Sequence, residues 1–171
     1  MDSFVRELDK HNDDYCTPPE TWKNIAKYLP KGEGVQIWEA FYNDESTSAT
    51  TLRELGCNVI SENADFFTTK LGTHIVSNPP FSCKEAVFKR LAELDMPFIV
   101  LLPSHSLCAR YIKRYFKNQI QIIIPDTRLH YMKKDKDTGD RVVLKRTTFD
   151  SVYVCYKIGL PRDLLFLCTQ R

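Results

Sequence analysis

Short apolar runs alternate with amphipathic segments along most of the chain. In the amphipathic segments apolar side chains recur every three or four residues, as Trp22, Ile25 and Leu29 do, which is typical of helices with one buried face. The apolar runs are short and rich in β-branched residues, which is typical of buried strands. The pattern predicts helices within residues 17–29, 43–56, 83–95 and 106–118, and strands over residues 34–41, 57–61, 73–78, 96–103, 119–125 and 149–158.

Strands that alternate with helices predict a parallel sheet with helices on both faces, which is a doubly wound, Rossmann-like α/β fold. The last two predicted strands, 119–125 and 149–158, have no helix between them, so this closing pair is expected to be antiparallel. The polar stretch 126–148 that joins them is expected to be a hairpin-like excursion. Residues 1–14 are polar and are expected to be mobile or loosely docked. We expect one domain over residues 1–171.

Composition indicates the class of protein and the cellular location to expect for this domain. The chain has 171 residues, of which 43% are hydrophobic and 27% charged, as in ordinary globular proteins. The sequence shows no signal-peptide pattern and no apolar run near the ~20 residues that span a bilayer, so we expect a cytoplasmic or nuclear protein without a membrane partner. The six cysteines and four histidines are scattered singly, so neither a disulfide framework nor a metal site is expected.

Candidate chemistry gathers where predicted strands end. Ligands of doubly wound folds bind beyond the carboxyl ends of the strands, and both Glu39 and Asn78 follow strands there. A carboxamide at a buried strand end needs a partner, or costs ~1–3 kcal/mol. Asn78 and the main chain of the prolines after it could accept hydrogen bonds from an exocyclic amine, while Phe81 offers a face for a planar ring. Such acceptors would aim the lone pair of the amine at an electrophile.

Asn78-Pro79-Pro80-Phe81 resembles the catalytic motif of class I S-adenosylmethionine-dependent methyltransferases that act on amino groups. The resemblance implies a methyltransferase domain of this fold with S-adenosyl-L-methionine as cofactor. In it, Asn78 and Pro79 orient the amine, Pro80 completes the motif and Phe81 stacks the base. Members that methylate adenine N6 in nucleic acids are the favoured match, and glutamine methyltransferases of proteins are an alternative.

Other segments resemble the cofactor motifs of this family, in the expected order from about Tyr15 to Ile158. Tyr15-Cys16-Thr17-Pro18 resembles the N-terminal motif beside the methionine part of the cofactor. Residues 37–41 resemble the first cofactor motif. In this family an acidic residue after the second strand, here Glu62, binds the ribose of the cofactor. An Asp-Phe pair, here Asp65-Phe66, holds its adenine. The cofactor residues implied are Tyr15, Thr17, Glu39, Phe41, Asn43, Glu62, Asp65 and Phe66.

The first cofactor motif departs from the family pattern. Relatives read Glu-Pro-Phe-x-Gly-x-Gly, whereas this chain has Asn43 and Glu45 at the glycine positions. Asn visits left-handed backbone conformations more readily than most residues, but Glu45 places a bulky carboxylate where bare backbone is expected. The departure leaves a second hypothesis, a catalytically impaired pseudo-methyltransferase that binds nucleic acid.

Two basic clusters favour nucleic acid, DNA before RNA, over a protein substrate. One is the helical face of Arg110, Lys113, Arg114 and Lys117; the other lies in the 126–148 excursion. The chain has no room for a recognition domain beyond that excursion, so a relaxed specificity, a single-stranded or structured RNA substrate, or a recognition subunit is expected. The resemblance places a base-contacting aromatic at Tyr131. The residues of the excursion cluster are Lys133, Lys134, Lys136, Arg141, Lys145 and Arg146.

Overall fold

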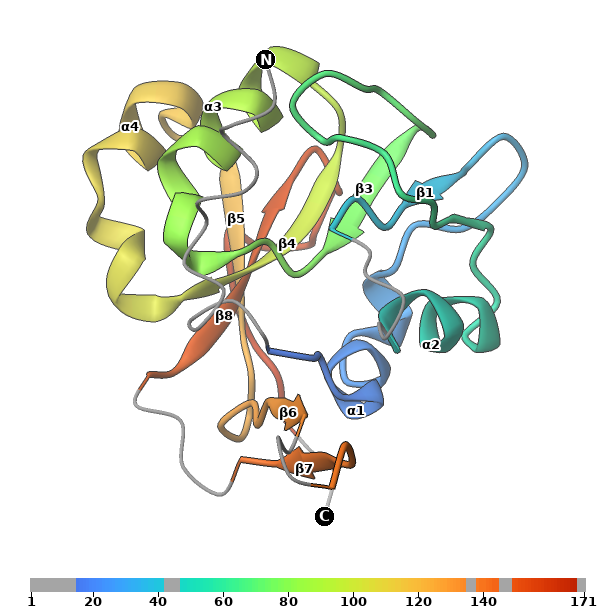
Figure 1. The fold of residues 1–171 in the computed structure, drawn as a ribbon. Helices are drawn as coiled ribbons and strands as arrows, with labels where there is room; N and C mark the ends of the chain where they lie inside the picture. Colours follow the sequence, from blue (N-terminus) through green and yellow to red (C-terminus); the bar gives the residue numbers. More distant parts are fainter. Residues whose placement is uncertain (1–14, 42–46, 135–137, 145–148, 169–171) are drawn as a thin grey trace.

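The computed structural model describes residues 15–41, 47–134, 138–144 and 149–168. A seven-stranded sheet crosses the molecule in the order β2-β1-β3-β4-β8-β5-β9 (Figure 1). All neighbouring pairs are parallel except those made by β8, which runs antiparallel to both β4 and β5. The mostly parallel sheet and its antiparallel pair confirm the predicted doubly wound, Rossmann-like α/β fold. Its strands are β1 (Ile37–Trp38), β2 (Val59–Ile60), β3 (His74–Ser77), β4 (Phe98–Pro103), β5 (Ile120–Ile124), β8 (Ser151–Tyr156) and β9 (Leu164–Phe166).

Alternating side chains of β4 divide the core between the two faces of the sheet. All six residues of β4 are buried. Phe98, Val100 and Leu102 pack on the face covered by α3 (Lys84–Leu94) and α4 (Arg110–Phe116). Ile99 and Leu101 pack on the opposite face, under α1 (Pro19–Lys23) and α2 (Ser48–Glu54). A strand covered on both faces must be apolar throughout, which explains the continuous apolar run of residues 98–103.

Several predicted boundaries differ from those observed. The helix expected within residues 17–29 is α1 followed by a 3-10 turn, η1 (Ala26–Tyr28). The helix expected over residues 106–118 is split, because Ala109 is extended, with φ −66° and ψ 139°, between η3 (Ser104–Cys108) and α4. The strand at 149–158 was expected to be the last, which is wrong, since β9 follows it and pairs with β5.

The excursion after β5 contains a second, two-stranded sheet. Strands β6 (Met132–Lys134) and β7 (Arg141–Val143) pair antiparallel. Residues 135–137 and 145–148 lie outside the described residues. At the base of the excursion, the Arg128 guanidinium meets the Asp150 carboxylate through two contacts of 2.6 and 3.2 Å. This ion pair joins the chain just before the excursion to the chain just after it.

The first strand is positioned by a close backbone contact at Gly72. The carbonyl oxygen of Gln36, just before β1, accepts hydrogen bonds from the backbone N–H groups of Thr73 and His74, just before and at the start of β3. Gly72 has φ +64°, and a Cβ there would lie 2.7 Å from that carbonyl oxygen. Only glycine fits without strain at such a position.

Within the described residues, no helix has the length and apolar character needed to cross a membrane.

We predict that Gly72→Ala destabilises the fold more than Gly34→Ala. Both glycines have positive φ, but a Cβ at Gly34 would meet no atom within 4 Å, whereas at Gly72 it would collide with the Gln36 carbonyl. The strained backbone alone costs about 1 kcal/mol, and the collision adds to it at Gly72 only. Urea denaturation of both variants measures the difference, and equal free energies of unfolding would contradict it.

Candidate active site

The order of the sheet reverses between β1 and β3. From β1 the chain moves to β2 on one side, and later to β3 and β4 on the other. The carboxyl ends of β1 and β3 therefore flank the switch point of the fold, where doubly wound domains bind ligands. Glu39 directly follows β1, and Asn78 directly follows β3. The two residues that sequence reasoning singled out at strand ends thus come together at this point.

Glu39 is a buried carboxyl group, with 2% of its surface exposed. The Ser77 hydroxyl donates a hydrogen bond of 2.5 Å to its Oε1, while its buried Oε2 has no hydrogen-bond partner. Burial raises the pKa of Glu39 to about 7, against the smaller opposing effects of the hydrogen bonds from Ser77 and from the Phe41 backbone. The unpartnered oxygen is a site where a hydrogen-bond donor, above all a cation, would be stabilised.

Asn78 carries a second unpartnered acceptor. Its Oδ1 is buried and has no hydrogen-bond partner. The chain then passes through Pro79, which is buried, and Pro80, which is extended at φ −61° and ψ 132°. Because proline restricts φ, the backbone beside the amide oxygen has little freedom to turn away. A fixed, buried acceptor of this kind is suited to an N–H donor that arrives with a ligand.

A small cavity joins these two acceptors. Thr17 at its wall is buried, and its backbone carbonyl accepts a 2.6 Å hydrogen bond from the Thr47 hydroxyl. Ser48, at the start of α2, accepts a 2.9 Å bond from the indole N–H of Trp22. The cavity therefore draws on four separate segments of the chain. Its lining residues are Tyr15, Cys16, Thr17, Glu39, Phe41, Ser48 and Asn78.

The N-terminal wall of the cavity is held by the excursion. Cys16 and Met132 exchange two backbone hydrogen bonds, of 2.8 and 2.9 Å, in an isolated antiparallel bridge. The Tyr131 carbonyl accepts a further 2.8 Å bond from the Leu144 N–H, next to β7. Residues 15–17 are thus attached to the strand that begins the β6–β7 hairpin.

An aromatic cluster fills the space beside the cavity. It consists of Tyr15, Phe81, Tyr131 and Phe149, whose ring centroids lie 5.3–6.4 Å apart in all six pairings. Phe81 meets Phe149 edge-to-face at 5.3 Å. Tyr131 has no exposed surface, and its hydroxyl donates a 2.8 Å bond to Ser151. Tyr131 thus lies in the interior of the cluster, whereas Tyr15, Phe81 and Phe149 are partly exposed.

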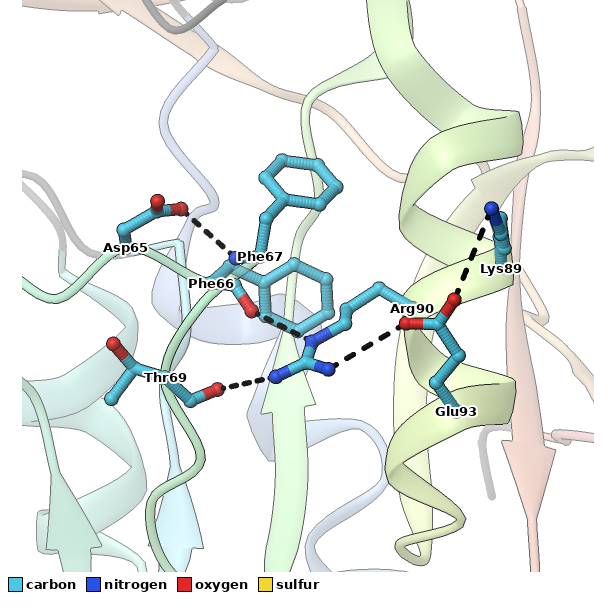
Figure 2. Close-up of polar contacts among 7 residues, drawn as sticks. All are labelled: Asp65, Phe66, Phe67, Thr69, Lys89, Arg90 and Glu93. Carbon is cyan, nitrogen blue, oxygen red and sulfur yellow. Dashed lines mark hydrogen bonds and ion pairs between the residues drawn. The ribbon is translucent and has the colours of Figure 1, made fainter. Parts of the chain in front are cut away.

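The segment after β2 has a different arrangement from the cavity. Asp65 accepts hydrogen bonds from the Phe67 backbone N–H at 2.9 Å and the Thr68 hydroxyl at 3.2 Å. Phe66 is buried in the core, 4.6 Å from the ring of Phe41, while Phe67 is 37% exposed. Arg90 on α3 holds this turn by donating to the carbonyls of Phe66 and Thr69 (Figure 2).

The predicted cofactor residues therefore fall into three groups. Tyr15, Thr17, Glu39 and Phe41 line the cavity together with Asn78. Phe66 reaches that group only through its contact with Phe41, and Glu62 and Asp65 are exposed on the segment after β2. Asn43 lies outside the described residues, as does Glu45.

The two predicted basic clusters lie on different elements. On α4 the side chains of Arg110, Lys113 and Arg114 are exposed, and Arg114 lies 3.6 Å from the Glu85 carboxylate of α3. Lys117 is exposed just past the end of that helix, with φ +52°. On β6 the ammonium of Lys133 lies 5.8 Å from the centroid of the Tyr15 ring. Lys134 follows in β6, while Lys136, Lys145 and Arg146 lie outside the described residues.

The described part of the chain holds no group of three or more residues suited to a metal ion.

Sequence reasoning assigned no role to Cys16, Ser48, Ser77 or Phe149. Ser77 is the last residue of an apolar strand, and nothing in the run of residues 74–77 marks its hydroxyl as a partner of Glu39. Ser48 lies in a polar stretch that predicts only a turn and a helix. Phe149 precedes the strand β8, and its position in an aromatic cluster follows from the pairing of distant segments. An aromatic residue at a predicted strand start was the one available signal, and it is a weak one.

No protein-family model matches the chain, and no curated protein matches it either. Among solved structures, the chain is similar to precorrin-6y C5,15-methyltransferase from Geobacter metallireducens, with 7% identity, coverage of 81% of this chain and 89% of that one, and a TM-score of 0.44. It is also similar to the 23S rRNA methyltransferase ErmE, with 14% identity, 81% and 68% coverage and a TM-score of 0.42. A third is precorrin 8w decarboxylase from Methanobacterium thermoautotrophicum, with 13% identity, 85% and 97% coverage and a TM-score of 0.45. At these identities and scores, the likeness identifies neither a family nor a substrate.

We predict that Glu39 makes the ligand-free protein less stable as the pH rises. Its pKa is about 7 in the folded state against 4.5 for an unburied carboxyl, so the folded state binds its proton more tightly. Between these two values the unfolded chain releases the proton first, and the contribution of Glu39 to the free energy of unfolding falls by about 3 kcal/mol.

Urea denaturation at pH 5 and pH 8 measures this contribution. Glu39→Gln removes the titrating group, so its stability should fall less over this interval than that of the wild type. The exposed Glu54, changed to Gln, serves as the matched control and should follow the wild type. Identical pH profiles for wild type and Glu39→Gln would contradict the assignment of the raised pKa to Glu39.

Proposed function

We propose that this protein is a methyltransferase that uses S-adenosyl-L-methionine to methylate the exocyclic N6 amine of adenine in nucleic acid, DNA in preference to RNA. One observation carries the proposal. Two buried acceptor oxygens without partners, Oε2 of Glu39 and Oδ1 of Asn78, border one cavity at the switch point of a doubly wound fold. A ligand pair that brings a cation and an amine satisfies both.

The residues of the cavity fit such a cofactor by their chemistry. When bound, S-adenosyl-L-methionine supplies a methyl group on a positively charged sulfur, next to a cationic ammonium group. Glu39 is an unpaired carboxyl group in a wall whose described residues include no lysine, arginine or histidine, so an incoming cation has no competitor there. Tyr15 and Thr17 would border the methionine part, and Glu62, Asp65 and Phe66 would hold the nucleoside part. Asn43, from the first cofactor motif, would be a further cofactor contact.

Asn78 would act on the amine. Its Oδ1 would accept a hydrogen bond from one N–H of the adenine amine, and the main chain at Pro79 would accept the other. Acceptors on both hydrogens favour a tetrahedral nitrogen whose lone pair points toward the methyl group. The cofactor would supply the methyl group that this nitrogen accepts, and the amine would lose one proton to solvent. Phe81, after Pro80, would stack the flipped base, next to Tyr131 in the aromatic cluster.

The basic residues would hold the nucleic acid backbone. Lys133 and Lys134 on β6 and Arg141 on β7 belong to the hairpin that is joined to the cavity wall through Cys16. Arg110, Lys113, Arg114 and Lys117 on and after α4 form the second proposed contact. A recognition subunit would supply the sequence specificity.

Methyl transfer with radiolabelled S-adenosyl-L-methionine tests the proposed function. We predict that DNA oligonucleotides containing adenine become labelled at N6, RNA less so, and that Asn78→Ala lowers kcat by at least ~100-fold, as loss of one preorganised polar contact does in other enzymes. The exposed Asn118, changed to Ala, should leave the rate unchanged.

Three outcomes would contradict the proposed function in different ways. Labelling of a protein but of no oligonucleotide would indicate a glutamine-amide substrate. Cofactor-independent binding of oligonucleotides without any transfer would indicate a pseudo-methyltransferase. Full activity of Asn78→Ala would show that the amide does not orient the amine.

We predict that the hairpin contributes more to nucleic acid binding than the α4 face does. Lys133→Ala should weaken oligonucleotide binding and reduce the slope of log K against log salt by about 1, because one phosphate contact is lost. Lys113→Ala, on the α4 face, is the matched charge-removing variant and should change both quantities less. Fluorescence anisotropy at several salt concentrations measures them, and a larger effect for Lys113→Ala would reverse the assignment.

A further inference from the structure

Ser77 lies between the two halves of the candidate site. It is the last residue of β3, it has no exposed surface, and it directly precedes Asn78. In the sheet Ser77 pairs in register with Val100 of β4, so the parallel pairing of β3 with β4 fixes its backbone. Neither the predicted motif nor the proposed function assigns it a role.

The hydroxyl of Ser77 both donates and accepts. It donates the 2.5 Å hydrogen bond to Oε1 of Glu39, and it accepts a 3.3 Å bond from the backbone N–H of Phe41. Both partners belong to the segment that follows β1. A single buried side chain therefore connects the end of β3, which carries Asn78, to the cavity wall that carries Glu39 and Phe41.

Among the described residues, the Ser77 hydroxyl is the one side-chain group that donates a hydrogen bond to Glu39. The cavity wall also contains Tyr15, Cys16 and Thr17 from the N-terminal segment, Ser48 from α2 and Asn78, which follows β3. Glu39 is the one carboxyl group among the described lining residues, which include no lysine, arginine or histidine. With Oε1 held by Ser77, the carboxyl group has its other oxygen left over for a ligand.

We infer that Ser77 is a positioning residue of the cofactor site, whose hydroxyl fixes the Glu39 carboxylate so that Oε2 serves a cationic ligand beside Asn78. This inference rests on the proposed function, because the cationic ligand is the methionine part of the cofactor. Ser77 touches neither cofactor nor substrate and acts through Glu39.

A positioning role has a consequence that a packing role lacks. The Ser77 hydrogen bond favours the ionised form of Glu39 and so lowers its pKa, against the larger effect of burial. Ser77→Ala should therefore raise the pKa of Glu39 further. Since a cationic ligand needs the ionised carboxylate, cofactor binding in the variant should be weakest at low pH and recover as the pH rises.

Calorimetric titration with S-adenosylhomocysteine at pH 6.5, 7.5 and 8.5 tests this inference. Ser77→Ala should weaken binding about tenfold at pH 6.5, which is the effect of losing one hydrogen bond to a charged group, and the loss should shrink by pH 8.5. Ser77→Cys, which keeps a weaker donor of similar size, should lie between the two. Ser106→Ala, at another buried serine away from the cavity, should match the wild type.

The results separate the inference from the proposed function. An unchanged affinity of Ser77→Ala, or a loss that is equal at all three pH values, would overturn the positioning role while the wild type still binds. A folded wild type that binds no S-adenosylhomocysteine would contradict the proposed cofactor. In that case ¹³C NMR titration of the Glu39 carboxyl still decides the role of Ser77, because its pKa must rise in Ser77→Ala, and an unchanged pKa would overturn the inference.

Discussion

The buried carboxyl group of Glu39 is the constraint around which the candidate site is arranged. A carboxylate removed from water is costly unless it is paired, and Glu39 has one hydroxyl partner and one oxygen without any. Stability alone would favour an apolar residue at the end of β1. The proposed cofactor would bring a cation to the Glu39 oxygen that no described residue partners. Burial raises the pKa of Glu39, and the cavity lies beside this carboxyl group.

The rest of the fold brings the other parts of the site to this group. Reversal of strand order at β1 and β3 places Asn78 at the same edge as Glu39. The Cys16–Met132 bridge holds residues 15–17 over that edge and connects them to the β6–β7 hairpin. The Arg128–Asp150 ion pair closes the base of the same excursion. The backbone hydrogen bonds of this bridge therefore connect the hairpin to the cavity wall.

Much of this arrangement could be predicted because it follows from local patterns. Apolar runs marked the strands, and the edge shared by their carboxyl ends followed from the parallel sheet, so the meeting of Glu39 and Asn78 could be expected. The strand β9 could not, since its exposed Leu164 and Phe166 resemble neither a buried nor an alternating strand. The sequence also could not predict which of the two adjacent phenylalanines is buried, because identical neighbours give no sign that Phe66 is buried and Phe67 exposed. The role of Ser77 depends on a contact between residues 38 positions apart.

The most direct test of the account is the number of protons released when S-adenosyl-L-methionine binds, measured by calorimetry at pH 7 in buffers of different ionisation enthalpy. With a pKa of about 7, Glu39 is roughly half protonated before binding, and a cation beside it requires the ionised form. The account predicts release of about half a proton by the wild type and none from this source by Glu39→Gln. Binding with equal proton release in both proteins, or no binding by the folded wild type, would contradict it.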